Sequence, residues 1–69
     1  MINITEHAQD RMVQRDISLA NVITTLKQGR KISQYDKPGV ILSVTEAFTV
    51  VYAKVGKSID ILTVYGETA

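Results

Sequence analysis

The spacing of apolar residues changes once along this chain, from a helical period to an alternating one. Before Gly29, apolar side chains recur at every third or fourth position, as they do on one face of a helix. After Gly29 they alternate with polar residues in short runs, which is typical of half-buried β-strands. The sequence therefore predicts helices in its first part and a sheet in its second part.

Two helices are predicted before Gly29. Thr5 is a suitable N-cap residue for a first helix over about Glu6–Arg15, and Ser18 is a suitable N-cap residue for a second. Lys27 in the last turn and Gly29 at the C′ position are the charge and the glycine typical of a helix end. The apolar stripes of the two helices consist of Ala8 and Met12 in the first and Leu19, Val22, Ile23 and Leu26 in the second.

Four strands are predicted after Gly29. They cover Arg30–Tyr35, Val40–Thr45, Phe48–Lys54 and Ser58–Tyr65. Asp36-Lys37-Pro38-Gly39 and Val55-Gly56-Lys57 have the composition of turns, and Gly66–Ala69 is expected to be a frayed tail. In the last strand, alternation places Ile59, Ile61, Thr63 and Tyr65 on one face and Asp60, Leu62 and Val64 on the other.

This order of elements predicts a single α+β domain over residues 1–69. Its two N-terminal helices are expected to pack on one face of a four-stranded antiparallel meander. The opposite face of the sheet then has no helix, and its strand positions are not purely polar. We expect a ligand, a partner or a second copy of the protein to cover part of it, which makes a homodimer one of the predictions.

Composition narrows the class of protein. The 69 residues are 45% hydrophobic and 22% charged, which favours a packed globule over a disordered chain. Cysteine is absent, so no disulfide or thiolate zinc site is possible, and no apolar run reaches the roughly 18 residues that span a bilayer. We expect a cytoplasmic protein without membrane contact. The net charge of +1 leaves any RNA binding to local clustering of cations.

Candidate chemistry begins in the segment HAQDRMVQRDI, residues 7–17. His7, Arg11 and Arg15 recur at every fourth position and therefore form one stripe on a helix. Because two guanidiniums and an imidazole gain little stability from lying side by side, the stripe indicates an anion site or a set of polar anchors. His7 is suited to proton transfer and the arginines to phosphate binding. The alternative leaves His7 bonded to backbone and the arginines anchored to carboxylates or strand-end carbonyls.

The strands add a second group of candidates. Thr63 and Tyr65 are assigned to the catalytic group with the stripe, and Tyr35 and Lys54 to substrate binding, since a tyrosine can stack on a base. The alternative for these tyrosines, and for Tyr52, is a β-forming residue with its ring in the core and its hydroxyl in water. One histidine and scattered carboxylates give no metal-ligand spacing, and no phosphate-binding glycine loop is present. We therefore expect no metal and no cofactor.

The pattern HA-xx-RM-xx-R-x-I, the following helix that ends in glycine and the final strand ILTVY resemble a small bacterial and phage family of unknown function. The matched positions are His7, Ala8, Arg11, Met12, Arg15, Ile17, Gly29, Thr63 and Tyr65. In outline the chain is also similar to the BrnT and RelE/ParE toxins, which are compact α+β domains. RelE- and BrnT-type relatives are metal-independent ribonucleases and ParE-type relatives act on gyrase, so this resemblance implies a fold without fixing an activity.

Two hypotheses about function follow. The first is a toxin-like, metal-independent endoribonuclease or a remnant of one, acting on RNA. A ribose 2′-hydroxyl would attack the neighbouring phosphate while His7 moves a proton and Arg11 or Arg15 stabilises the developing charge. The alternative is a noncatalytic protein-interaction module, such as a regulator, an antitoxin-like partner or a phage-type inhibitor of a host target.

Overall fold

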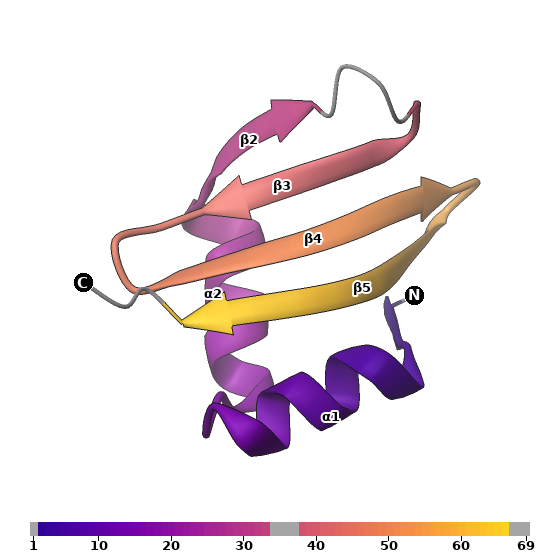
Figure 1. Ribbon diagram of the computed structural model, residues 1–69. Coiled ribbons are helices and arrows are strands. Elements are labelled where there is room, and N and C mark those ends of the chain that lie inside the picture. The colour runs from indigo at the N-terminus through magenta and orange to yellow at the C-terminus, as the bar shows by residue number, and fades with distance from the viewer. Residues whose placement is uncertain (1, 34–37, 67–69) are drawn as a thin grey trace.

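The computed structural model describes residues 2–33 and 38–66. In chain order the elements are β1 (Ile2–Ile4), α1 (Glu6–Gln14), α2 (Leu19–Gln28), β2 (Arg30–Ser33), β3 (Val40–Val44), β4 (Phe48–Val55) and β5 (Ser58–Gly66). The described strands form one five-stranded sheet in the order β1-β5-β4-β3-β2, with β1 parallel to β5 and the other pairs antiparallel. Figure 1 shows β5, β4, β3 and β2 side by side in this order. The α+β class is confirmed, but the predicted four-stranded antiparallel meander is wrong.

The strand missing from the prediction is β1. Its three residues, Ile2–Ile4, are too few to show an alternating pattern, and they pair with Ile59–Ile61 near the other end of the chain. Parallel strands cannot be joined by a tight turn, so no local sequence signal marks the pair. The connection between β1 and β5 contains both helices and the other three strands.

Both predicted N-caps are confirmed. The Thr5 hydroxyl accepts a hydrogen bond from the backbone N–H of Ala8. The Ser18 hydroxyl accepts from the backbone N–H of Asn21, whose side chain accepts from the backbone N–H of Ser18. This reciprocal pair satisfies two donors that a helix start otherwise leaves without partners.

Gly29 follows the last residue of α2, as predicted, but it does not act as the C′ glycine typical of helix ends. It is the C-cap residue, in an extended conformation at φ −70° and ψ 152° that any residue adopts. A Cβ at this position would collide with the Ser43 hydroxyl and would lie 2.5 Å from the Thr25 carbonyl oxygen. Glycine is required here because α2 approaches β3 closely.

A β-bulge in β5 changes which of its residues share a face. Val51 pairs with Thr63, but the next residue of β4, Tyr52, pairs with Ile61, so Leu62 is an extra residue in β5. Paired residues lie on the same face, and alternation is interrupted at the bulge. The predicted face assignment is therefore wrong beyond Ile61: Val64 joins Ile61 in the core, whereas Thr63 and Tyr65 lie on the opposite face with Val51 and Thr49.

The core lies between the sheet and the two helices. In Figure 1, α2 crosses behind the sheet and α1 runs along β5. The buried apolar residues are Ala8, Ile17, Val22, Val50, Tyr52, Ile61 and Val64. No helix in the described part of the chain is long and apolar enough to cross a membrane.

The remaining predicted strands agree with the structure to within a residue or two where residues are described. Tyr35, Asp36 and Lys37 lie outside the described residues, so the end of the first predicted strand and half of its turn are not described. Gly66, which was predicted to begin the tail, instead ends β5.

The side of the sheet without helices is called the open face below. The strand register assigns to it Asn3, Arg30, Ile32, Val40, Leu42, Val44, Thr49, Val51, Ala53, Val55, Ser58, Asp60, Thr63 and Tyr65.

Candidate functional site

Helix α1 is attached to β5 at both of its ends. At its start, the backbone N–H and the hydroxyl of Thr5 donate to the carbonyl of Ile61, at 3.2 and 2.7 Å. At its end, Nη1 of Arg15 donates to the carbonyl of Val64 at 2.9 Å. Because β1 pairs only with Ile59–Ile61, α1 occupies the edge of β5 beyond that point. We call the boundary formed by His7, Arg11, Arg15, Thr63 and Tyr65 the α1–β5 seam.

Arg15 is the best-defined member of the seam. Its guanidinium carbon lies 5.7 Å from the centroid of the Tyr65 ring, within the range of a cation–π contact. A guanidinium has five N–H donors, and only one of the five is used by the Val64 carbonyl. Arg15 is exposed, and its guanidinium makes no second hydrogen bond with the described residues, so it has donor capacity left for an anion.

The other two residues of the helical stripe are less constrained. Nη1 of Arg11 donates to Oε1 of Gln14 at 2.8 Å, and its side chain is half-buried. His7 is exposed, and its side chain makes no hydrogen bond or ion pair with the described residues. At a rise of about 1.5 Å per residue, His7 and Arg15 start about 12 Å apart along the helix axis. One phosphate cannot contact both, but Arg11 lies within about one turn of each.

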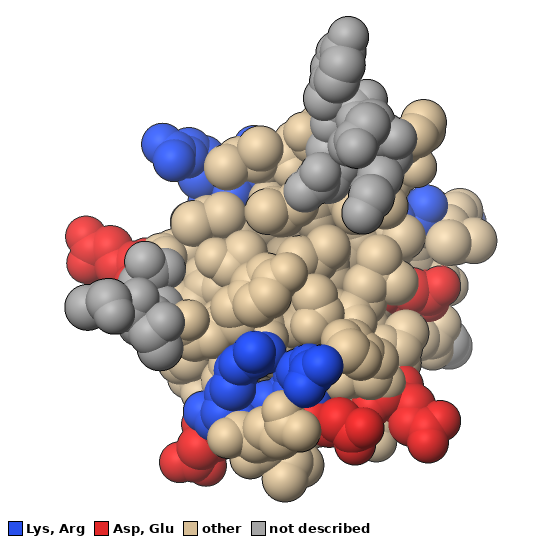
Figure 2. All heavy atoms as spheres, in the orientation of Figure 1, with Lys and Arg blue, Asp and Glu red and all other residues tan. Residues whose placement is uncertain are grey.

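The open face contributes Thr63 and Tyr65 to the same boundary. Thr63 is half-buried, and its place in β5 is between the two carbonyls that hold α1, those of Ile61 and Val64. Tyr65 is 43% exposed. Figure 2 shows blue side chains gathered over the seam between α1 and β5, and Arg11 and Arg15 are the only cations of α1, its C-cap and β5.

The two predicted substrate-binding residues do not join the seam. Lys54 pairs with Ile59 on the helix side of the sheet, and it is five residues along β4 from Thr49, the partner of Tyr65. At about 3.4 Å per residue, this separation is about 17 Å. Tyr35 lies outside the described residues.

Tyr52 follows the structural alternative. It is 5% exposed and belongs to the core cluster, so its ring cannot stack on a ligand at the surface. Burial raises the pKa of its hydroxyl above the usual 10.0, because the charged phenolate is poorly solvated there.

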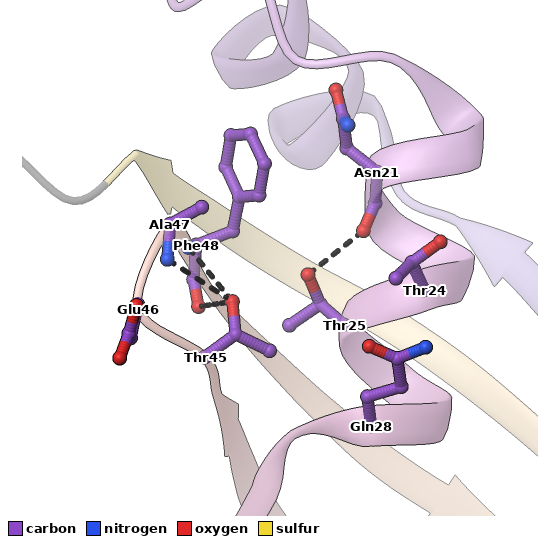
Figure 3. A pocket seen from close by; sticks show the side chains of 8 residues that line it. All are labelled: Asn21, Thr24, Thr25, Gln28, Thr45, Glu46, Ala47 and Phe48. Atoms are coloured by element: carbon purple, nitrogen blue, oxygen red, sulfur yellow. Dashed lines mark hydrogen bonds between the residues drawn. The ribbon is translucent and has the colours of Figure 1, made fainter.

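Sequence reasoning did not predict a hollow of about 500 Å³ between α2 and the β3–β4 turn (Figure 3). It is lined by Asn21, Thr24, Thr25, Gln28, Thr45, Glu46, Ala47 and Phe48. The Thr25 hydroxyl donates to the Asn21 carbonyl, and the Thr45 hydroxyl accepts from two backbone N–H groups of the turn. These hydroxyls serve the local backbone, and Glu46 is the one charged residue of the lining. The hollow therefore offers less chemistry than the seam.

Metal ligands are not clustered in the described residues, where no three His, Asp or Glu side chains come together. What the seam offers is an imidazole, two guanidiniums, a hydroxyl and a phenol ring at one solvent-facing boundary. These groups suit the binding of a phosphate with an attached ring, and the transfer of a proton beside it.

Residues 4–66 match the model of the family described as "Domain of unknown function (DUF4258)", and the chain therefore belongs to that family. The comparisons with curated proteins and with solved structures gave no match. Family membership brings no activity with it, so the function must be argued from the site.

Proposed function

We propose that the protein is a metal-independent endoribonuclease whose active site is the α1–β5 seam. The observation that carries the proposal is the Arg15 guanidinium, which lies over the exposed Tyr65 ring and makes one hydrogen bond with the described residues, on the same stripe as Arg11 and His7. The four-stranded antiparallel meander expected from the resemblance to the BrnT and RelE toxins is wrong, so that resemblance adds no support to the proposal.

In this proposal, nucleotide binding and the chemical step take place at two different positions along the seam. Arg15 and Tyr65 hold one nucleotide, the guanidinium on its phosphate and the ring on its base. One turn earlier, Arg11 stabilises the charge that gathers on the scissile phosphate. His7, a further turn away, takes the proton of the attacking 2′-hydroxyl or returns one to the leaving 5′-oxygen. The products are a 2′,3′-cyclic phosphate and a 5′-hydroxyl end.

The experiment is cleavage of end-labelled RNA oligonucleotides by the purified full chain, in the presence of a metal chelator. We expect His7→Ala to slow cleavage by about 100-fold or more, the typical loss of a general acid or base. Asp10→Ala is the matched control, since Asp10 is an exposed residue of the same helix outside the seam. Arg15→Lys keeps the charge but loses the planar fork, and we expect it to weaken binding more than it slows the chemical step.

Intact RNA at a large excess of wild-type protein would contradict the proposal. Cleavage that persists unchanged in His7→Ala would show that the activity comes from a contaminant or from another site. A product with a 3′-hydroxyl end would exclude attack by the 2′-hydroxyl.

A noncatalytic interaction module is the second candidate, and the observation that favours it is the open face. Ile32 and Val55 are 42% and 59% exposed there. An antitoxin-like or host protein that covers this face is the partner this candidate requires. It is distinguished from the first by stable complex formation that His7→Ala leaves unchanged.

A further inference from the structure

We propose that the open face is the contact surface of a homodimer, in which two copies pack their sheets face to face with the strands crossing at about a right angle. The open face includes Thr63 and Tyr65 of the seam, but the inference rests on Arg30, Asp60 and the uncharged middle of the face and does not depend on RNA cleavage. Its evidence is the composition of the face, the position of its two charged residues and its area.

On the open face, residues paired between neighbouring strands form rows that run across the sheet. The middle row runs from Ile32 through Leu42 and Val51 to Thr63 and contains no charge. Figure 2, which looks onto this side of the sheet, shows its middle in tan with blue and red side chains toward the rim. An uncharged centre can meet a copy of itself without placing like charges together.

The small core explains why this apolar surface is left over. None of the described Leu, Met or Phe side chains is fully buried, and the buried apolar cluster consists of seven residues. A domain of this size is only marginally stable, and self-association is a common way for such domains to gain burial. Leu42 and Val51 are half-buried within one copy and become fully buried in the dimer.

Among the described residues, the two charged residues of the face indicate how the copies are oriented. Arg30 pairs with Val44 in β2, at one corner, and Asp60 pairs with Ala53 in β5, at the diagonally opposite corner. A two-fold axis that lies between the sheets along the other diagonal places Arg30 of each copy against Asp60 of its partner. The strands of the two copies then cross at about 90°, one of the two preferred sheet-packing angles. Oδ1 of Asp60 accepts a hydrogen bond from Nδ2 of Asn3 at 3.1 Å, and the carboxylate can accept a further hydrogen bond from Arg30 of the other copy.

Area and edge chemistry favour a second copy on this face. Strands spaced about 4.8 Å apart with a rise of about 3.4 Å per residue give a footprint on the order of 500 Å². Two copies together bury about 1,000 Å², the lower limit for a specific interface, so a weak, concentration-dependent dimer is expected. The exposed edge strand β2 carries Arg30 and Lys31 within four residues, which disfavours edge-to-edge pairing instead.

The test is sedimentation velocity of the full chain over a range of micromolar concentrations. Wild-type protein should change from monomer to dimer as the concentration rises. Arg30→Glu and Asp60→Lys should each weaken association by about tenfold, since each places like charges together at both corners. The double variant with both charges reversed restores the pairing, and its association should return to within about threefold of wild type.

Val51→Lys tests the centre of the face. It should weaken association by about 100-fold because two ammonium groups would be buried together. Thr24→Lys adds the same charge to the exposed side of α2 and should leave the dimer unchanged. If circular dichroism shows that Val51→Lys is unfolded, Val51→Thr, which keeps the branched shape and adds a hydroxyl, should still weaken association several-fold.

Wild-type protein that stays monomeric at every concentration would overturn the proposal. A folded Val51→Lys variant that dimerises like wild type would overturn the assignment to this face. Association in the double charge-reversal variant that is weaker than in either single variant would overturn the orthogonal arrangement.

Discussion

Replacing Gly29 by alanine tests the close approach of α2 to β3. The backbone of Gly29 suits any residue, so the substitution carries no conformational penalty of its own. The new methyl group would collide with the Ser43 hydroxyl, and would lie 2.5 Å from the Thr25 carbonyl oxygen and 2.9 Å from the Val44 nitrogen. Two of these three atoms belong to the backbone and cannot rotate away.

The magnitude follows from the cost of adding a methyl group to a filled site, about 1–3 kcal/mol. The clash can be relieved only if β3 shifts against α2. We therefore expect the upper end of this range, a loss of about 3 kcal/mol in the free energy of unfolding. For a domain of this size that corresponds to a loss of about 12 °C or more in Tm. The assay is urea or thermal unfolding followed by circular dichroism, with the wild type measured alongside.

Gly66→Ala is the matched control. A Cβ at Gly66 meets no heavy atom within 4 Å, so its effect should stay within about 0.5 kcal/mol. The double variant Gly29→Ala with Ser43→Ala removes the nearest obstacle to the new methyl group. Its loss of unfolding free energy should be about 1 kcal/mol smaller than the sum of the losses in the two single variants.

Equal unfolding midpoints for Gly29→Ala and Gly66→Ala, with unchanged slopes, would refute the reasoning. They would mean that the α2–β3 contact adjusts without cost. If the stability loss of the double variant equals the sum of the losses in the two single variants, Ser43 is not the group that excludes the methyl.

Two further predictions concern the anchoring of α1 and the core. Thr5→Ala removes both the N-cap of α1 and the bond to the Ile61 carbonyl, and should cost about 1–2 kcal/mol in urea unfolding; Thr24→Ala, on an exposed helical position, should cost nothing measurable. Tyr52 has its pKa raised by burial, so its contribution to stability is complete below pH 10 and is lost as the pH rises through the folded-state pKa. Unfolding free energy measured against pH should therefore fall above pH 10 in the wild type and fall less in Tyr52→Phe, whereas identical slopes would contradict a buried phenol.

The local parts of the fold were predictable because their signals lie within a few residues. Thr5 and Ser18 were identified as N-caps from side-chain type and from the apolar pattern that follows each of them, and both cap their helices in the structure. The end of α2 at Gly29 was also predictable. Its cause was not, since two of the three atoms that exclude a Cβ belong to Ser43 and Val44, fourteen and fifteen residues later in the chain.

The candidate site was only partly predictable for the same reason. The stripe of His7, Arg11 and Arg15 follows from helical periodicity alone. That Tyr65 lies beside Arg15 depends on the bulge at Leu62, which moves Tyr65 off the face that simple alternation gave it. Lys54 had the right chemistry for the site, but strand pairing placed it on the other side of the sheet, about 17 Å along β4 from the partner of Tyr65.

The sequence by itself determined the helices, most strand boundaries and the α+β class, because periodicity, caps and turns are local properties of the chain. Only the tertiary structure decided that Ile2–Ile4 forms a fifth strand parallel to β5, and that β5 carries a bulge. Pairing between distant segments is set by the free energy of the whole packed domain. Neighbouring residues along the chain do not encode it, and for that reason the seam and the open face could be located only in the folded protein.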